Sequence, residues 1–136
     1  MAFETKLLYE LELPVPFTVA DSVGIEKGAL LEINDPWTVT TTNGASDKIV
    51  GIAAEEKIAN DGKVTLGVYL RGVVKGFAGA GGVVVGQAIR SDAGNDPNEL
   101  VIAAANEEGI VGTAWETASN LESFKFLLNP INPVLA

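Results

Sequence analysis

Two stretches of the chain, "DKIVGIAAEE" at Asp47–Glu56 and "EEGIVGTAWE" at Glu107–Glu116, nearly repeat each other. Aligned on their central glycines, Gly51 and Gly112, each stretch has a short apolar run before the glycine and a glutamate after it. We interpret the two glycines as matched points where strands cross closely or bulge, leaving no room for a side chain. Chance similarity among small apolar residues is the alternative.

The likeness extends upstream of both stretches. "KGALLEINDP" at Lys27–Pro36 precedes the first copy and "VGQAIRSDAG" at Val85–Gly94 precedes the second, each with a glycine, a short apolar strand and an Asp-containing turn. Units this short cannot each bury a core of their own, so two copies must share one. The sequence therefore predicts an internally duplicated strand-turn-strand unit.

Composition favours one all-β domain. The chain of 136 residues is 47% hydrophobic and 20% charged, and it contains 15 glycines. Glycine costs about 1 kcal/mol against alanine inside a helix, whereas turns, bulges and close strand crossings use its conformational freedom. We therefore expect a small β-barrel or sandwich.

Short apolar or alternating segments punctuated by Gly, Asp and Asn predict the strands. They lie at Ala29–Ile33, Thr38–Thr42, Ile49–Ala53, Val64–Val74, Val83–Ile89, Leu100–Ala104, Ile110–Trp115 and Ser123–Leu128. In the last of these, Phe124 and Phe126 are expected to point inward. A helix remains the alternative for Ala53–Asn60 and for Glu99–Glu108.

The first residues have the pattern of a separate strand. In "KLLYELEL" at Lys6–Leu13, one face of an extended segment carries Leu7, Tyr9, Leu11 and Leu13. Pro14–Pro16 follows, and two prolines are expected to interrupt a sheet ladder. We thus expect an extended N-terminal arm at 1–16, a barrel-like body at 17–128 and an irregular tail at 129–136. The arm either docks on another subunit or closes its own barrel.

Charge and hydropathy argue against two classes of partner. The net charge is −9, and the nine basic residues show no cluster in the sequence, so neither nucleic acid nor an anionic membrane is expected to bind. No apolar run approaches the roughly 20 residues of a membrane span. Met1–Pro16 carries Glu4, Glu10 and Glu12 where a secretion signal would need an uninterrupted apolar stretch.

Catalysis and cofactor binding are not expected either. The chain has no cysteine and no histidine, the usual thiolate nucleophile and general base. The glycine-rich Gly76–Gly86 lacks the Lys-Ser/Thr of a phosphate-binding loop. Oxygen ligands gathered at Ser91–Glu99 suit calcium, but the same residues also suit a simple turn. We predict no catalytic residue, no cofactor and no metal site.

Four stretches carry a resemblance to a known family. They are "GIEKGALLEI" (Gly24–Ile33), "KIVGIAAEEKIANDGKVTLGVYLRGVV" (Lys48–Val74), "GGVVVGQAIRSDAG" (Gly81–Gly94) and "GIVGTAWETASNLESFKFLL" (Gly109–Leu128). In the order and spacing of these segments, the chain resembles the capsid decoration, or cement, proteins of tailed phages.

The resemblance implies a structural virion protein that decorates and stabilises the outside of an icosahedral capsid. It implies a homotrimer at three-fold or quasi-three-fold positions, bound to the major capsid protein after synthesis in the host cytoplasm. The arm, with Leu7, Tyr9, Leu11 and Leu13, would then add a strand to a neighbouring subunit or shell protein. The alternative class is a non-catalytic adaptor or a carrier-type β-barrel binding module. A carrier needs a lysine at a hairpin tip beside methionine, and Lys63 lacks that setting.

Overall fold

The computed structural model describes residues 3–42, 48–92, 96, 98–103 and 109–131. In these residues the chain forms strands and turns and no helix, so the predicted all-β class is confirmed. The strands are β1 (Lys6–Glu10), β2 (Val15–Thr18), β3 (Leu30–Asp35), β4 (Thr38–Thr41), β5 (Ile49–Ala53), β6 (Thr65–Tyr69), β7 (Gly72–Phe77), β8 (Ala88–Ser91), β9 (Leu100–Ile102), β10 (Ile110–Ala114) and β11 (Ser123–Ile131).

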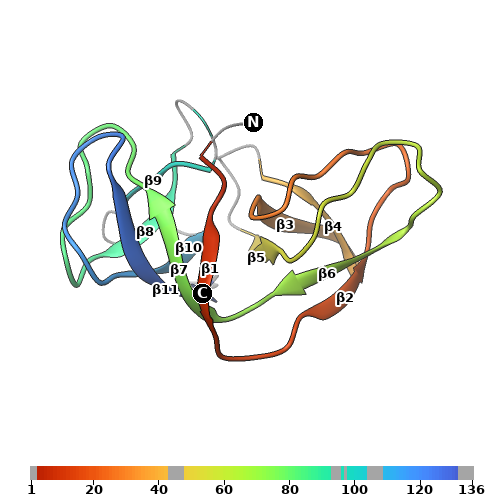
Figure 1. The fold of residues 1–136 in the computed structure, drawn as a ribbon, viewed down its shortest axis with the longest axis horizontal. Helices are drawn as coiled ribbons and strands as arrows, with labels where there is room; N and C mark the ends of the chain where they lie inside the picture. The colour runs from red at the N-terminus through yellow and green to blue at the C-terminus, as the bar shows by residue number, and fades with distance from the viewer. Residues whose placement is uncertain (1–2, 43–47, 93–95, 97, 104–108, 132–136) are drawn as a thin grey trace, which may run out of the picture.

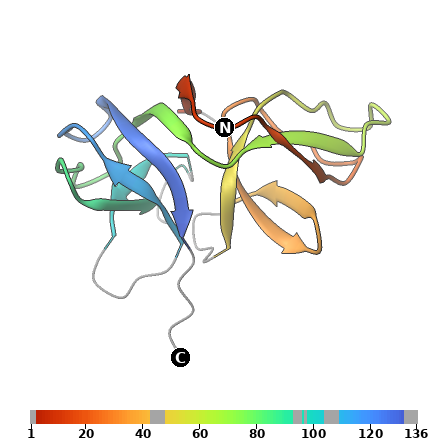
Figure 2. The same cartoon turned by 90° about the horizontal axis from the view of Figure 1, so that it is seen from below.

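The strands fall into two lobes with the same topology (Figures 1 and 2). The first repeat, residues 15–69, is a closed barrel in the order β2-β4-β3-β5-β6. The second repeat, residues 72–131, has the sheet order β7-β11-β10-β8-β9. Reading β4-β3-β5-β6-β2 in the barrel against β9-β8-β10-β11-β7 in the sheet matches every strand in chain order. The duplicated unit is thus a five-stranded one, larger than the strand-turn-strand unit predicted.

Backbone hydrogen bonds recur between the repeats in the same places. The Gly28 N–H donates to the Ala53 carbonyl at 2.9 Å, and the Gly86 N–H donates to the Ala114 carbonyl at 2.7 Å. Both glycines have a left-handed backbone, with φ of 87° and 86°, a conformation that glycine adopts without steric cost. The structure therefore supports duplication over chance similarity.

The two repeats pack together through an apolar core. Leu30, Ile49 and Ile52 of the first repeat belong to the buried cluster of the second, whereas Leu31 points into the barrel. This alternation is what a strand with two buried faces produces. The buried Asn98 side chain accepts a hydrogen bond from the Leu30 N–H at 3.1 Å, which adds a polar tie between the repeats.

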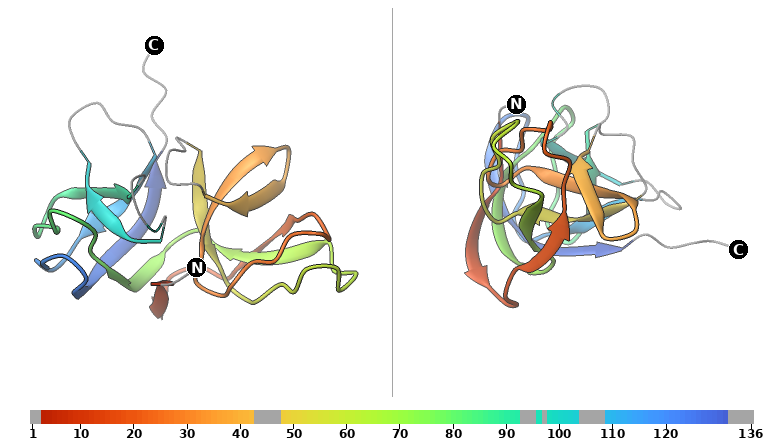
Figure 3. Two further views of the ribbon diagram at one scale, coloured as in Figure 1. Left: turned by 90° about the horizontal axis from the view of Figure 1, so that it is seen from above. Right: turned by 90° about the vertical axis from the view of Figure 1, so that its right-hand side faces the viewer.

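Two predicted strands are shorter or divided in the structure. Val64–Val74 was expected as one strand, but it forms β6 in the barrel and β7 in the second sheet, with the chain crossing between repeats at Leu70 and Arg71 (Figure 3). Val83–Ile89 is extended only from Ala88, because the left-handed Gly86 interrupts the strand. Before it, Val83 makes an isolated bridge to Ala118.

Strand β2 begins inside the segment expected to belong to the arm. Val15 and Pro16 lie opposite Val68 and Gly67 of β6. The Thr18 N–H points away from β6, toward the Trp37 carbonyl at 2.6 Å, so the nitrogen of Pro16, two residues earlier, faces the same side. In the described chain no strand pairs with Pro16 on the side away from β6. A proline is tolerated in a strand at such a position, because its nitrogen has no hydrogen to donate.

The remaining differences lie near the C-terminus and at the two helix alternatives. β11 continues to Ile131, which pairs with Ile110, so it extends into the expected tail. Neither alternative helix forms in the described residues, and Leu100–Ile102 is a strand; residues 104–108 lie outside the described part. Phe124 and Phe126 are buried, as predicted. No helix in the described chain has the length and apolar character to cross a bilayer.

Candidate interaction surface

The N-terminal strand is held by both repeats of its own chain. The buried Thr5 donates two hydrogen bonds to the Gly28 carbonyl in the first repeat, from its N–H at 3.0 Å and from its Oγ1 at 2.7 Å. Strand β1 then pairs antiparallel with β7 of the second repeat (Figure 1). The strand therefore bridges the two repeats.

Two glycines make room for this strand. A Cβ atom at Gly28 would overlap the Thr5 carbonyl oxygen, and one at Gly72 would lie 2.6 Å from the Leu7 Cδ1 atom. A side chain at Gly28 would push the strand away, because it would meet the Thr5 backbone, whereas one at Gly72 would require the Leu7 side chain to move. Gly28 and Gly72 thus provide the space in which Thr5–Glu10 lies against the two repeats.

A bulge in β1 changes which side chains of the predicted apolar face point to the core. Leu7 lies opposite Val74 and Tyr9 opposite Val73, so Leu8 is an extra residue without a partner. Leu7 therefore packs on the core, whereas Tyr9 points to the outer face of the sheet and is 67% exposed. The prediction that Leu7, Tyr9, Leu11 and Leu13 share one face is wrong for this reason.

The predicted partner-binding residues beyond Leu7 are open to solvent. Tyr9 lies one residue before the end of the paired strand β1, and Leu11 and Leu13, which are 52% and 79% exposed, lie in the connection to β2. Glu12 between them lies 3.5 Å from Arg71 of the crossing between repeats. The structure thus places three large, exposed apolar side chains within five residues, a feature typical of a contact surface.

Gly51 and Gly112 occupy equivalent places in β5 and β10. A Cβ at Gly51 would overlap the carbonyl oxygen of Tyr69 in β6, and a Cβ at Gly112 would overlap that of Leu127 in β11. Strand pairing is irregular beside each glycine. The two backbones therefore approach too closely for any side chain.

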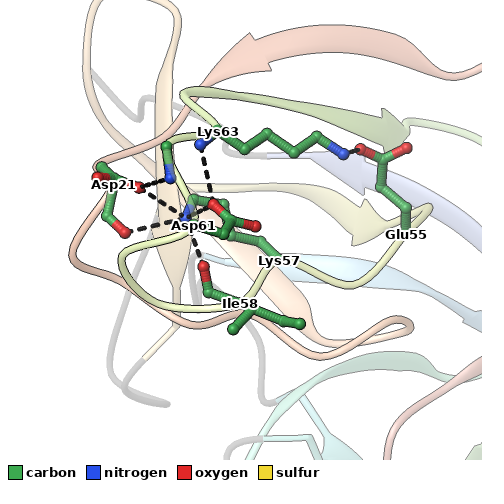
Figure 4. A network of polar contacts seen from close by, with 7 residues as sticks. Asp21, Glu55, Lys57, Ile58, Asp61 and Lys63 are labelled. Carbon is green, nitrogen blue, oxygen red and sulfur yellow. Dashed lines mark hydrogen bonds and ion pairs between the residues drawn. The ribbon is translucent and has the colours of Figure 1, made fainter.

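A buried lysine, missed in the sequence, joins two loops at the tip of the first repeat (Figure 4). The Lys57 side chain is fully buried, and its Nζ donates to the Asp21 carbonyl, the Ile58 carbonyl and Asp61 Oδ1, each at 2.9 Å. This hydrogen bond from Lys57 is the main cause that lowers the pKa of Asp61. An alignment of the two repeats could have pointed to this site. Lys57 aligns with Ala118, a small apolar residue that is buried in the second repeat, so a buried position is expected for the lysine as well.

The described residues of the Ser91–Glu99 segment include a turn. Within the described chain, no group of three or more His, Cys, Asp or Glu side chains is arranged to hold an ion. Instead the Asp96 carboxylate accepts a hydrogen bond from the Asn98 N–H at 2.9 Å, as in an Asx turn. Residues 93–95 and 97 lie outside the described part.

Glu99 in this turn predicts a pH-dependent stability. Its side chain is buried, and burial first, then the Asp92 and Asp96 carboxylates, raise its pKa. The unfolded chain therefore releases this proton at a lower pH than the folded chain, and the free energy of unfolding falls as the pH rises through that interval. We expect Glu99→Gln, which keeps the neutral form, to weaken this fall in melting curves recorded from about pH 4 to about pH 8. Parallel curves for the two proteins would contradict it.

A cavity of about 320 Å³ lies between the N-terminal strand and the first repeat. Its walls include Leu7, Ile52, Ala53 and Tyr69, with Lys6 and Lys27 among the lining residues. No carboxylate lines it among the described residues, so the cavity offers no acid-base pair of carboxylates.

These features define a class: an all-β protein of two fused barrel-like repeats, with an exposed apolar segment beside the strand that ties them together. The chain belongs to the phage cement protein family, whose sequence profile matches residues 12–128. It is thus a structural protein of the phage capsid. The match begins at residue 12, so strand β1 lies outside it.

A solved structure has a similar fold. The crystal structure of the head fiber gp8.5 N base in bacteriophage phi29 matches with a TM-score of 0.51 and 17% sequence identity, over 84% of this chain and 92% of that chain. At this identity the likeness concerns the fold. No curated protein sequence matches the chain.

Proposed function

We propose that the protein decorates the outside of an icosahedral phage capsid as a homotrimer at three-fold or quasi-three-fold positions. It is made in the host cytoplasm, binds the major capsid protein and stabilises the shell against the pressure of packaged DNA. Membership of the cement protein family over residues 12–128 is the observation that carries this proposal. A protein that contacts two neighbouring shell subunits makes their separation harder, because the surface that it buries on both subunits would have to be exposed again.

The exposed part of the arm supplies one attachment surface. Tyr9, Leu11 and Leu13 are available to a neighbouring subunit or shell protein, whereas Leu7 is engaged with its own core. Burying each exposed side chain is worth about 1.5 to 3 kcal/mol before ordering costs are subtracted. Since β1 already pairs with β7, these side chains, rather than the addition of a free strand, make the contact.

Decoration of isolated shells tests the attachment surface. The triple variant Tyr9→Ser, Leu11→Ser and Leu13→Ser should fold normally, because all three side chains are exposed, and should bind shells at least about 10-fold more weakly, a loss of about 1.4 kcal/mol or more. Co-sedimentation with capsids assembled without the protein measures binding. A control variant, Ile58→Ser with Val64→Ser, removes exposed apolar side chains elsewhere and should bind like wild type. Equal binding by the triple variant and wild type would rule out this surface.

A further inference from the structure

Three lysines that are far apart in the sequence lie side by side in the second repeat. Lys6 of β1 is directly opposite Lys75 of β7, and Lys75 is directly opposite Lys125 of β11. Directly opposite residues of antiparallel strands point to the same face, with Cβ atoms about 5 Å apart. Lys6, Lys75 and Lys125 thus form a lysine row across β1, β7 and β11. Figure 1 shows these three strands side by side.

The lysine row lies on the outer face of the sheet and is exposed. The residues next to it in the same strands, Leu7, Val74 and Phe126, point to the core. Among the described residues, no carboxylate forms an ion pair with any of the three lysines. Like charges directly opposite each other destabilise a sheet, so the row works against the stability of the isolated chain.

The first repeat shows that the fold does not require these lysines. Its equivalent pair is Pro16 opposite Gly67, which takes the place of Lys75 opposite Lys125. The row also continues into an aromatic residue that the first repeat lacks. The Trp115 N–H donates to the Lys125 carbonyl at 2.9 Å, as the Ala54 N–H does to the Gly67 carbonyl at 2.9 Å.

The surroundings of the row are those of a protein interface. Trp115 at its end is 50% exposed. The adjacent positions on the same face are Tyr9, Val73 and Leu127, which also lie opposite one another across β1, β7 and β11. Aromatic side chains beside partly exposed apolar ones are enriched where proteins meet. This face is therefore better suited to bind a protein than a small anion.

The charge of the chain points to a second copy as the partner. Three of the nine basic residues lie in the row, which leaves six to balance eighteen acidic residues over the rest of the molecule. The rest of the molecule therefore has a net charge of −12, opposite in sign to the row. We propose that the lysine row, with Trp115, binds the acidic surface of the next copy in a head-to-tail contact.

Such a contact joins two different surfaces, and head-to-tail contacts close into rings when the rotation allows. A ring of three copies would use one lysine row at each joint. The inference thus identifies one surface of the proposed trimer and rests on that trimer. It uses a different face from Leu11 and Leu13, which lie in the connection to β2, whereas Tyr9 borders both surfaces.

Sedimentation of full-length variants tests the proposal. Lys6→Gln, Lys75→Gln and Lys125→Gln together should weaken self-association at least about 10-fold at about 50 mM salt and abolish its salt dependence. The control variant, Lys27→Gln, Lys63→Gln and Arg71→Gln, changes the net charge equally and should associate like wild type. At concentrations where all proteins are monomeric, the row variant should melt about 1 to 4 °C higher than wild type, because the lysine repulsion is gone.

The outcomes separate this inference from the proposed function. Trimers of the row variant as stable as those of wild type would overturn the inference, and a simultaneous loss of shell binding would assign the row to the shell protein instead. A wild-type chain that stays monomeric would also overturn it, while shell decoration by that monomer would leave the capsid role standing. Binding of the row to DNA with no effect on trimers would likewise overturn it.

Discussion

Replacing Gly112 with alanine is expected to lower the free energy of unfolding by more than about 3 kcal/mol, toward the upper end of what overpacking produces. The added Cβ would overlap the carbonyl oxygen of Leu127 and lie 2.9 Å from its carbonyl carbon. Both belong to the backbone of β11 at the centre of the second sheet, so no side-chain rotation relieves the clash. Urea unfolding followed by circular dichroism measures the change.

Gly51→Ala should have a similar effect in the first repeat, because a Cβ there would meet the backbone of Tyr69 in the same way. Gly67→Ala is the matched control within a strand. Its Cβ would have ordinary contacts, 3.5 Å from the Pro14 Cβ and 3.6 Å from the Ala54 Cβ, and its change should stay within about 0.5 kcal/mol. If Gly112→Ala were as stable as Gly67→Ala, the close strand crossing would be refuted.

Lys57→Ala is expected to cost about 2 to 4 kcal/mol of unfolding free energy. The substitution empties a fully buried space and leaves the carbonyls of Asp21 and Ile58 without the donor they have in the folded protein. Ala118 occupies the equivalent place in the second repeat, so alanine fits the backbone there, and the loss comes from packing and hydrogen bonds.

Lys63→Ala is the control for Lys57→Ala, since it removes a lysine from the same part of the first repeat. The Lys63 ammonium pairs with Glu55, but both side chains are about half exposed to solvent, and exposed ion pairs contribute about 0 to 1 kcal/mol. Thermal and urea unfolding of the two variants compare the sites. A small loss at Lys57, equal to that at Lys63, would show that the buried network does not hold the two loops together.

The duplication and most strands could be predicted from the sequence because their causes are local. The alternation around Phe124 and Phe126 and the shared pattern around Gly51 and Gly112 are properties of short segments. The glycine positions also carried information about packing, since only glycine allows so close an approach of two backbones.

The candidate surfaces depended on which strands pair and in which register, and the sequence could not show this. One bulge at Leu8 turned Tyr9 from the core to the outer face, because side chains alternate and one extra residue reverses the alternation. Basic residues that show no cluster along the chain became a row when Lys6, Lys75 and Lys125 met across three strands. By itself the sequence determined an acidic, duplicated β-protein. The tertiary structure decided where its cations and exposed apolar side chains gather, because neighbours across a sheet come from distant parts of the chain.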